Sequence, residues 1–233
     1  MFDYLKKNVV EREYKNLVLN NEEEKIEIIN ICRERKINSL VHFTNIKNLT
    51  SIIMNGIIPV MFQDEYKINP EINDINRIDD HLECTSFSIE FPNYRFFYNL
   101  RDKNKDKRFV IIKVNPAVIW NKYRNFCIHN AADSRILAKN KYSLSKSSEF
   151  SKMFSNIGII NRETLNIPDN YTTDPQAEVL IEGHIEVKYI DEIIFKSYED
   201  YNNFINNNHL KSNIKFKVNS RNFSARSDYN YWH

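Results

Sequence analysis

The stretch that decides the fold is residues 39–59, SLVHFTNIKNLTSIIMNGIIP, which predicts a short strand followed directly by a helix. In residues 46–53 the apolar side chains recur every three or four positions, as they do on one face of a helix. Thr44 stands at the junction, where it is placed to cap the helix, and Gly56 is a stop signal at its end. His42 lies on the apolar strand, where a lone histidine is more often a buried structural residue than a functional one.

The patterns on both sides of this stretch mix strands and helices. A cap followed by acidic residues at 21–24 predicts a helix, and the run RFVIIKV at 108–114 predicts a buried strand. Further strands are expected at 84–91, 124–128, 177–185, 189–196 and 214–218, and further helices at 93–100 and 197–207. Because these elements follow no regular strand–helix–strand order, the predicted fold class is α+β. Residues 143–175 are polar and lack a clear period, so a long loop is expected there.

The length of 233 residues predicts a single domain. Its core is expected at about 38–210, with an N-terminal helical extension at 1–37 and a basic C-terminal tail at 211–233. No apolar run is long enough to span a membrane, and the N-terminus lacks the apolar segment of a secretory signal. Three cysteines, an odd number spread along the chain, suit a reducing compartment, so we expect a cytoplasmic protein.

The formal net charge of +2 says little about partners, but the basic residues are clustered. Residues 101–108 and 211–226 are rich in lysine and arginine, and the second segment also contains Phe216 and Phe223. Cations mixed with aromatic rings suit a nucleic-acid strand, although a solvated loop and a final strand are the simpler interpretation. Because the chain has only three glycines, a P-loop and a glycine-rich dinucleotide motif are excluded.

Glu178 is the strongest candidate for chemistry. It opens a predicted strand directly after the long polar loop, which is a common position for a catalytic carboxylate. Glu182 lies on the same face of that strand and competes for the role. No metal is expected, because the close pair of Cys127 and His129 has no second pair at a zinc-site spacing.

Three motifs, taken in chain order, resemble those of the DarT family of DNA ADP-ribosyltransferase toxins. Residues 42–52, HFTNIKNLTSI, are similar to the family's HFT-x-x-x-NL-x-SI motif, and residues 74–77, DINR, are similar to its D-I-x-R element. Residues 176–180, QAEVL, are similar to the strand that carries the family's catalytic glutamate. Residues 85–95 depart from the family's pattern on the nucleic-acid side, so thymine and guanine both stay open as the modified base. The resemblance covers residues 39–185.

The resemblance implies an ADP-ribosyltransferase fold, in which a split β-sheet forms a cleft for NAD and helices decorate the sheet. NAD is then the co-substrate, and Glu178 stabilises the positive charge that develops on the ribose. Arg77 is the second implied catalytic residue, either for proton removal from the base or for orienting the base or the NAD phosphate. The implied NAD-binding residues are His42, Phe43, Thr44, Ser51 and Asp74. The implied DNA-binding residues are Asn93, Tyr94, Arg95, Tyr171, Thr172, Thr173 and Gln176.

The reaction implied by this resemblance is the transfer of ADP-ribose from NAD to a base of single-stranded DNA, because a base edge inside a duplex is out of reach. The implied partner is an antitoxin with ADP-ribosyl-glycohydrolase activity, which removes the mark. Two alternatives stay open. One is the same fold acting on RNA or protein, and the other is a non-catalytic nucleic-acid-binding domain that uses the basic tail.

Overall fold

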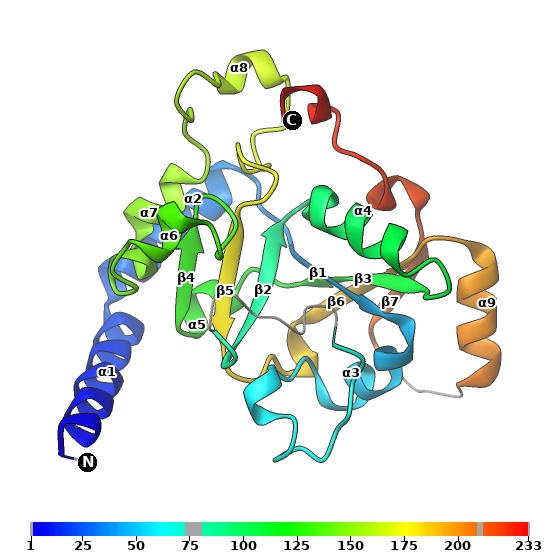
Figure 1. Ribbon diagram of the computed structural model, residues 1–233, viewed down its shortest axis with the longest axis horizontal. Coiled ribbons are helices and arrows are strands. Elements are labelled where there is room, and N and C mark those ends of the chain that lie inside the picture. The colour runs from blue at the N-terminus through cyan, green and yellow to red at the C-terminus, as the bar shows by residue number, and fades with distance from the viewer. Residues whose placement is uncertain (1, 73–80, 209–211, 233) are drawn as a thin grey trace.

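The computed structural model describes residues 2–72, 81–208 and 212–232 (Figure 1). Within these residues the strands form one seven-stranded sheet in the order β4-β5-β2-β1-β3-β6-β7. Neighbouring strands run antiparallel, except that β6 and β7 are parallel. The strands are β1 (Leu40–Asn45), β2 (Cys84–Ile89), β3 (Phe109–Val114), β4 (Arg124–Cys127), β5 (Glu178–Glu182), β6 (Ile190–Phe195) and β7 (Lys215–Val218).

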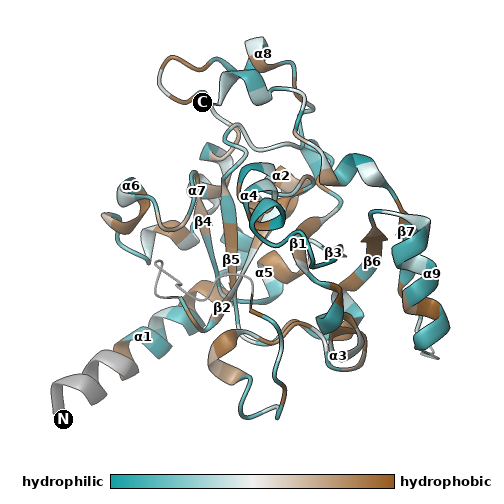
Figure 2. Ribbon diagram, turned by 45° about the vertical axis from the view of Figure 1, so that its right-hand side comes forward, coloured by the Kyte–Doolittle hydropathy of each residue, from teal (hydrophilic) through white to brown (hydrophobic). Residues whose placement is uncertain are grey.

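Helices cover both faces of this sheet, because alternate residues of each buried strand point to opposite sides. Val110 and Ile112 of β3 belong to the larger core, which contains residues of α2, α5, α7 and α9, whereas Phe109 and Ile111 pack on the other face with Phe97 of α4. Figure 2 shows β6 coloured as hydrophobic and α8 as largely hydrophilic. The helices are α1 (Phe2–Asn20), α2 (Glu22–Glu34), α3 (Leu49–Asn55), α4 (Tyr94–Lys103), α5 (Val118–Asn121), α6 (Ser134–Leu137), α7 (Ser147–Lys152), α8 (Arg162–Leu165) and α9 (Tyr198–Asn207).

The sheet opens between β1 and β2, and this opening creates the site. The two strands pair only at Leu40 with Ile89 and at Val41 with Ser88. Beyond Val41, β1 continues to pair with β3 along its whole length, while residues 84–87 of β2 pair with β5 instead. The strands therefore diverge and leave a gap in the middle of the sheet. The predicted α+β fold with a split sheet is confirmed.

Local signals explain several element boundaries. Asn21 caps α2, since its side chain accepts a hydrogen bond from the backbone N–H of Glu24 at 3.1 Å. Gly56 ends α3 with a φ of 82°, a left-handed conformation that glycine adopts readily. The expected cap at Thr44 is wrong, because β1 runs on to Asn45 and the Asn45 side chain accepts from the N–H of Lys47 at 2.9 Å.

Two segments are more ordered than their sequence patterns indicate. Residues 143–175, expected as a loop, contain α7 and α8, and helices of six and four residues are too short to show a period. The segment expected as a basic tail beyond the core contributes β7 to the sheet edge. In β7 the exposed Lys215 and Lys217 alternate with half-buried Phe216 and Val218, so the lysines face solvent and the apolar side chains cover the sheet.

The N-terminal part of the chain forms the two helices α1 and α2. Ile28 and Cys32 of α2 are buried in the larger core, whereas α1 reaches away from the sheet at the lower left of Figure 1. Among the described residues, none of the helices combines the length and the apolar character that a membrane crossing requires.

Candidate active site

A cavity of about 390 Å³ fills the opening between β1 and β2. Its walls come from β1, from α3 and the chain that follows it, from β2, and from the loop after β4. Its size and its mixture of apolar walls with a few polar groups are typical of small-molecule sites. The predicted site residues that line it are His42, Phe43, Thr44, Ser51, Asn93 and Glu178.

Glu178, at the first position of β5, is held from both carboxylate oxygens. The backbone N–H of Ala131 donates to its Oε2 at 2.8 Å, and Asn130 Nδ2 donates to its Oε1 at 3.2 Å. Both donors belong to the loop after β4, which is brought to this place because Cys127 pairs with Glu178 across the strands. The carboxylate is thus oriented toward the cavity that it lines. Asn130 and Ala131 were missed by sequence reasoning, since nothing local marks a contact 48 residues away.

Glu182, the competing carboxylate, has a different environment. Its Oε2 forms an ion pair with Lys15 Nζ at 2.7 Å, which ties α1 to the sheet, and it is not among the cavity-lining residues described. Burial alone lowers the pKa of Lys15, but its hydrogen bonds to Glu182 and Glu11 outweigh burial and raise that pKa above its usual value. The geometry therefore favours Glu178 for chemistry and gives Glu182 a structural contact.

His42 bridges the opened strands. Its Nδ1 lies 3.1 Å from the backbone oxygen of Ser86 on β2, at the level where the two backbones no longer pair. Because a carbonyl oxygen only accepts, Nδ1 carries the proton in this bond, and in the neutral ring Nε2 is then an acceptor. The ring also contacts Phe87, with ring centroids 5.7 Å apart. Two contacts on β2 thus hold a polar side chain of β1 at the cavity.

The residues after His42 support the cavity wall. The Phe43 ring stacks on Phe97 of α4 with 4.3 Å between centroids. The buried Thr44 Oγ1 accepts a hydrogen bond from Asn48 Nδ2 at 2.9 Å. Asn48 also holds the backbone of Glu71, accepting from its N–H at 2.8 Å and donating to its oxygen at 2.9 Å. Asn48 belongs to the same sequence motif as His42. The motif therefore marks Asn48 as a residue of interest, but it does not predict the contact with Glu71.

The Glu71 carboxylate is held in place by two lysines. Hydrogen bonds from Lys47 and Lys107 lower its pKa below the usual range. The Lys47 Nζ and Glu71 Oε1 atoms lie 2.7 Å apart, and Asn45 Nδ2 donates to Oε2 at 2.9 Å. Asp74 and Arg77, predicted for NAD binding and for catalysis, lie outside the described residues. Their predicted roles stay predictions.

The predicted DNA-binding residues fall into two groups by exposure. The side chains of Asn93, Tyr94, Thr172 and Thr173 are buried, which argues against a direct stacking contact with a base in this conformation. Arg95, Tyr171 and Gln176 are half-buried and remain accessible to a ligand. A role in DNA binding stays a prediction for all seven.

Asn93 has an unusual position among them. It caps α4, since its Oδ1 accepts from the N–H of Phe96 at 3.2 Å, and it lines the cavity. Within the described ranges of the chain its buried Nδ2 has no hydrogen-bond partner. A buried donor of this kind is costly unless a ligand or water accepts from it, so Asn93 marks a polar contact point in the cavity wall.

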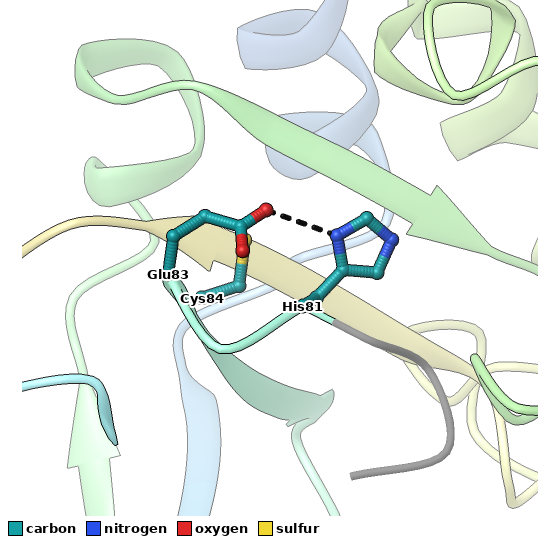
Figure 3. A group of neighbouring side chains, drawn as sticks. All are labelled: His81, Glu83 and Cys84. Atoms are coloured by element: carbon teal, nitrogen blue, oxygen red, sulfur yellow. Dashed lines mark hydrogen bonds and ion pairs between the residues drawn. The ribbon is translucent and has the colours of Figure 1, made fainter. Parts of the chain in front are cut away.

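A small cluster of metal-ligand types lies where the chain enters β2 (Figure 3). His81 Nδ1 lies 3.1 Å from Glu83 Oε1, and the ligand atoms of His81, Glu83 and Cys84 are all within 4.8 Å of one another. In the part of the chain that the structure describes, no fourth histidine, cysteine or carboxylate joins this group, whereas a structural zinc site takes four ligands. Cys84 belongs to an apolar cluster with Cys127 and Leu180, so the geometry is that of a core cysteine beside a histidine–carboxylate pair.

Comparison with known proteins identifies the family. Residues 41–224 match the family model described as "ssDNA thymidine ADP-ribosyltransferase, DarT". The chain belongs to the DarT family. This confirms the resemblance, and it extends the matched region beyond residue 185 through β7 to the segment that contains Phe223.

Solved structures show the same fold as this DarT-family chain. Thermosipho africanus DarTG in complex with ADP-ribose matches at 19 % identity with a TM-score of 0.57, over 80 % of this chain and 51 % of that one. This chain therefore spans about half the length of that protein. Thermus sp. 2.9 DarT in complex with NAD+ matches at 12 % identity with a TM-score of 0.53, over 80 % and 98 % of the two chains. Thermus sp. 2.9 DarT in complex with ADP-ribosylated ssDNA matches at 11 % identity with a TM-score of 0.55, over 81 % and 97 %. No curated protein sequence matches this DarT-family chain.

Proposed function

We propose that this protein transfers ADP-ribose from NAD+ to thymidine in single-stranded DNA. One observation carries the proposal: His42 of β1 and Glu178 of β5 line the same cavity in the opening of the sheet. The family supplies the reaction, since its model is described as an ssDNA thymidine ADP-ribosyltransferase. That description favours thymine over guanine, which the sequence alone left open.

The cavity residues fit a dinucleotide such as NAD+. The walls are mainly apolar, and polar groups converge from His42, Ser51, Asn93 and Glu178. The buried Nδ2 of Asn93, which has no partner among the described residues, is a donor that a ligand oxygen would satisfy. NAD+ supplies an ADP-ribosyl group on a nicotinamide leaving group, so a small pocket with fixed polar contacts suffices to orient it.

Glu178 is the catalytic residue in this proposal. Cleavage of the nicotinamide–ribose bond builds positive charge on the ribose, and a fixed carboxylate stabilises such charge more in the transition state than in the ground state. The hydrogen bonds from Asn130 and Ala131 keep the carboxylate in place, so it does not reorganise during the reaction. The new bond joins the ribose to a base nitrogen, nicotinamide leaves with the electron pair of the broken bond, and the proton of the base nitrogen passes to solvent. Arg77 remains the proposed partner for the base.

The biological setting belongs to the same proposal. Thermosipho africanus DarTG and the family resemblance support an antitoxin partner with ADP-ribosyl-glycohydrolase activity. We propose the cytoplasm as the compartment, because NAD+ and DNA strands are both present there and an odd number of cysteines suits a reducing environment. The basic-tail alternative loses support, since β7 is part of the sheet and Phe223 is buried against α4.

The test is intact-mass spectrometry of short oligonucleotides incubated with the protein and NAD+. We expect one ADP-ribose adduct on DNA strands that contain thymidine, none on strands that lack it, and none on the matching RNA. Glu178→Gln is expected to lower the rate by about 100-fold or more. The matched control is Glu182→Gln, which is expected to keep the rate within about twofold of the wild type, because its contact is with Lys15.

Three outcomes would contradict parts of this proposal. An adduct on strands without thymidine would move the acceptor to another base. An adduct on RNA would change the substrate class. Consumption of NAD+ with no adduct on any strand would leave protein or water as the acceptor.

A further inference from the structure

We propose that the C-terminal segment 226–232 is a clamp that positions the catalytic Glu178, with Arg226 as the positioning residue. This inference rests on the proposed function, because it concerns the same carboxylate. Figure 1 shows the end of the chain crossing the molecule toward the loop that leads into β5. The contacts of Arg226 with that loop are direct, and they lie beyond residue 224, where the match to the family ends.

Arg226 is a buried cation whose three nitrogens all donate. Its side chain is 3 % exposed. Nη1 donates to the backbone oxygen of Thr172 at 2.8 Å, and Nη2 donates to that of Thr173 at 2.9 Å. On its other side the guanidinium forms a bidentate pair with Asp228, with Nε to Oδ1 at 2.7 Å and Nη2 to Oδ2 at 2.5 Å. A planar fork thus joins two loop carbonyls to one carboxylate, a geometry that lysine does not reproduce.

Asp228 completes the clamp. It is 1 % exposed, and Oδ2 also accepts a hydrogen bond from Trp232 Nε1 at 2.8 Å. The guanidinium lies over the ring of Tyr171, 5.9 Å from its centroid. The charge of Arg226 is therefore paired, four of its five N–H groups donate to the groups named above, and its position is fixed by groups on both sides of it. A cation buried so completely is expected to hold the loop rather than to bind a solvent-exposed DNA strand.

Two sets of hydrogen bonds connect the loop that Arg226 binds, residues 172–174, with Glu178. The first follows the chain, since Thr172 Oγ1 donates to the backbone oxygen of Asp174 at 2.8 Å and the N–H of Gln176 donates to Asp174 Oδ1 at 2.7 Å. These bonds set the turn that ends at Glu178. The second set crosses to the loop after β4, because His129 Nδ1 lies 2.6 Å from Asp174 Oδ2 with both side chains buried.

The contact between His129 and Asp174 also leads to the Glu178 carboxylate. His129 immediately precedes Asn130 and Ala131, the two residues that donate to Glu178. Asp174 therefore connects the loop before Glu178 with the loop that holds its oxygens. A shift of residues 172–174 would move both supports at once. Displacement of a catalytic group by about 1 Å costs on the order of 100-fold in rate, so the clamp acts on turnover rather than on substrate binding.

The test compares kcat and KM for NAD+ and for the oligonucleotide in Arg226→Lys and Arg226→Met. Both variants are expected to lower kcat by about 10- to 100-fold while leaving the KM for NAD+ within about threefold. Lysine keeps the charge but lacks the fork, so it should not restore kcat. The matched control is Arg12→Met, at an exposed position on α1, which is expected to behave as the wild type.

Folding is measured in parallel by thermal unfolding. If the Arg226 variants do not fold, Trp232→Phe serves instead, because it removes only the indole donor to Asp228, and kcat is expected to fall by about two- to fivefold. A folded Arg226 variant, or Trp232→Phe, with an unchanged kcat would overturn the clamp. A rise in KM with an unchanged kcat would overturn it as well. Failure of the proposed function gives a different result, in which the wild type itself transfers no ADP-ribose.

Discussion

At the scale of single residues, Gly56 is a position in the cavity wall that has no room for a side chain. It lines the cavity, ends α3 at a φ of 82°, and precedes Ile57, which pairs with Ile185 after β5. A Cβ atom at this position would lie 2.1 Å from the backbone oxygen of Ile185. Backbone cannot yield as the far end of a side chain does, so the position requires glycine for space as well as for conformation.

Gly56→Ala is therefore expected to cost more than a conformational penalty alone. The left-handed φ costs about 1 kcal/mol for alanine, and the clash with Ile185 adds to it, so we expect the free energy of unfolding to fall by about 2–4 kcal/mol. Urea unfolding measures this change. Gly158→Ala is the matched control, because φ is 55° there and no atom lies within 4 Å of an added Cβ. Equal losses in the two variants would show that the contact with Ile185 contributes nothing.

At the scale of elements, ion pairs hold the short helices that pack beside β4. Glu149 of α7 is 6 % exposed and accepts from Lys139 at 2.7 Å and from Lys152 at 2.5 Å. Burial by itself raises the pKa of Glu149, but the two lysines outweigh burial and lower that pKa below its usual value. Lys139 comes from the chain after α6, so the carboxylate joins α7 to the segment that follows α6.

The sign of this effect predicts a loss of stability in acid. Because the folded pKa of Glu149 is lower than the unfolded one, its contribution is fully present above about pH 4.5 and is lost as the pH falls through the folded pKa. Glu149→Gln is expected to lower the free energy of unfolding by about 1 kcal/mol at pH 7, and the difference from the wild type should disappear in acid. Urea unfolding between pH 3 and 7 checks this. The exposed Glu163→Gln is the control, with an expected change below about 0.5 kcal/mol.

At the scale of the whole molecule, the opening between β1 and β2 divides the sheet into two parts. One part contains β4, β5 and β2, and the other contains β1, β3, β6 and β7. Strands β1 and β2 pair at Leu40 and Val41, and the His42 side chain adds a bridge to Ser86. A ligand in the cavity contacts both parts, so it is expected to stabilise the folded molecule as a unit.

NAD+ should therefore raise the unfolding temperature. A ligand at 100 times its Kd stabilises the folded state by about 2.7 kcal/mol, which corresponds to about 5–10 °C for a chain of this size. Thermal unfolding at increasing NAD+ concentration measures the shift. His42→Ala, which removes a cavity wall and the bridge to Ser86, is expected to need a higher NAD+ concentration for the same shift. An unfolding temperature that does not respond to millimolar NAD+ would contradict binding in this cavity.

Local chemistry made much of the fold predictable, and the reasons differ by element. The cap at Asn21 and the apolar run at 108–114 carry their own signals, and both elements appear where they are expected. The helices within 143–175 were not predictable, because four to six residues show no period. The opening of the sheet followed only from the family resemblance, since strand pairing depends on partners far away in the chain.

The candidate site was predictable only in part, for the same reason. His42 and Glu178 belong to recognisable motifs, and both line the cavity. The pair of His129 and Asp174 joins residues 45 positions apart, and the bonds from Arg226 to the loop span more than 50. Contacts of this range leave no local pattern, so the supports of Glu178 emerge only from the folded chain.

The order of the strands also has a consequence for the protein at high concentration. An unclosed sheet leaves two edges, and an exposed edge can recruit a strand from another molecule. β7 carries Lys215 and Lys217 on its exposed side. Pairing with β7 of a second molecule would bring the lysines of the two strands close together, and their repulsion opposes it. β4 is only four residues long and packs against the turn that begins at Ser143, and the Asn125 side chain donates a hydrogen bond to the backbone oxygen of Lys141. Both edges therefore disfavour strand pairing between molecules. The sheet can be open in its middle without its edge strands promoting aggregation.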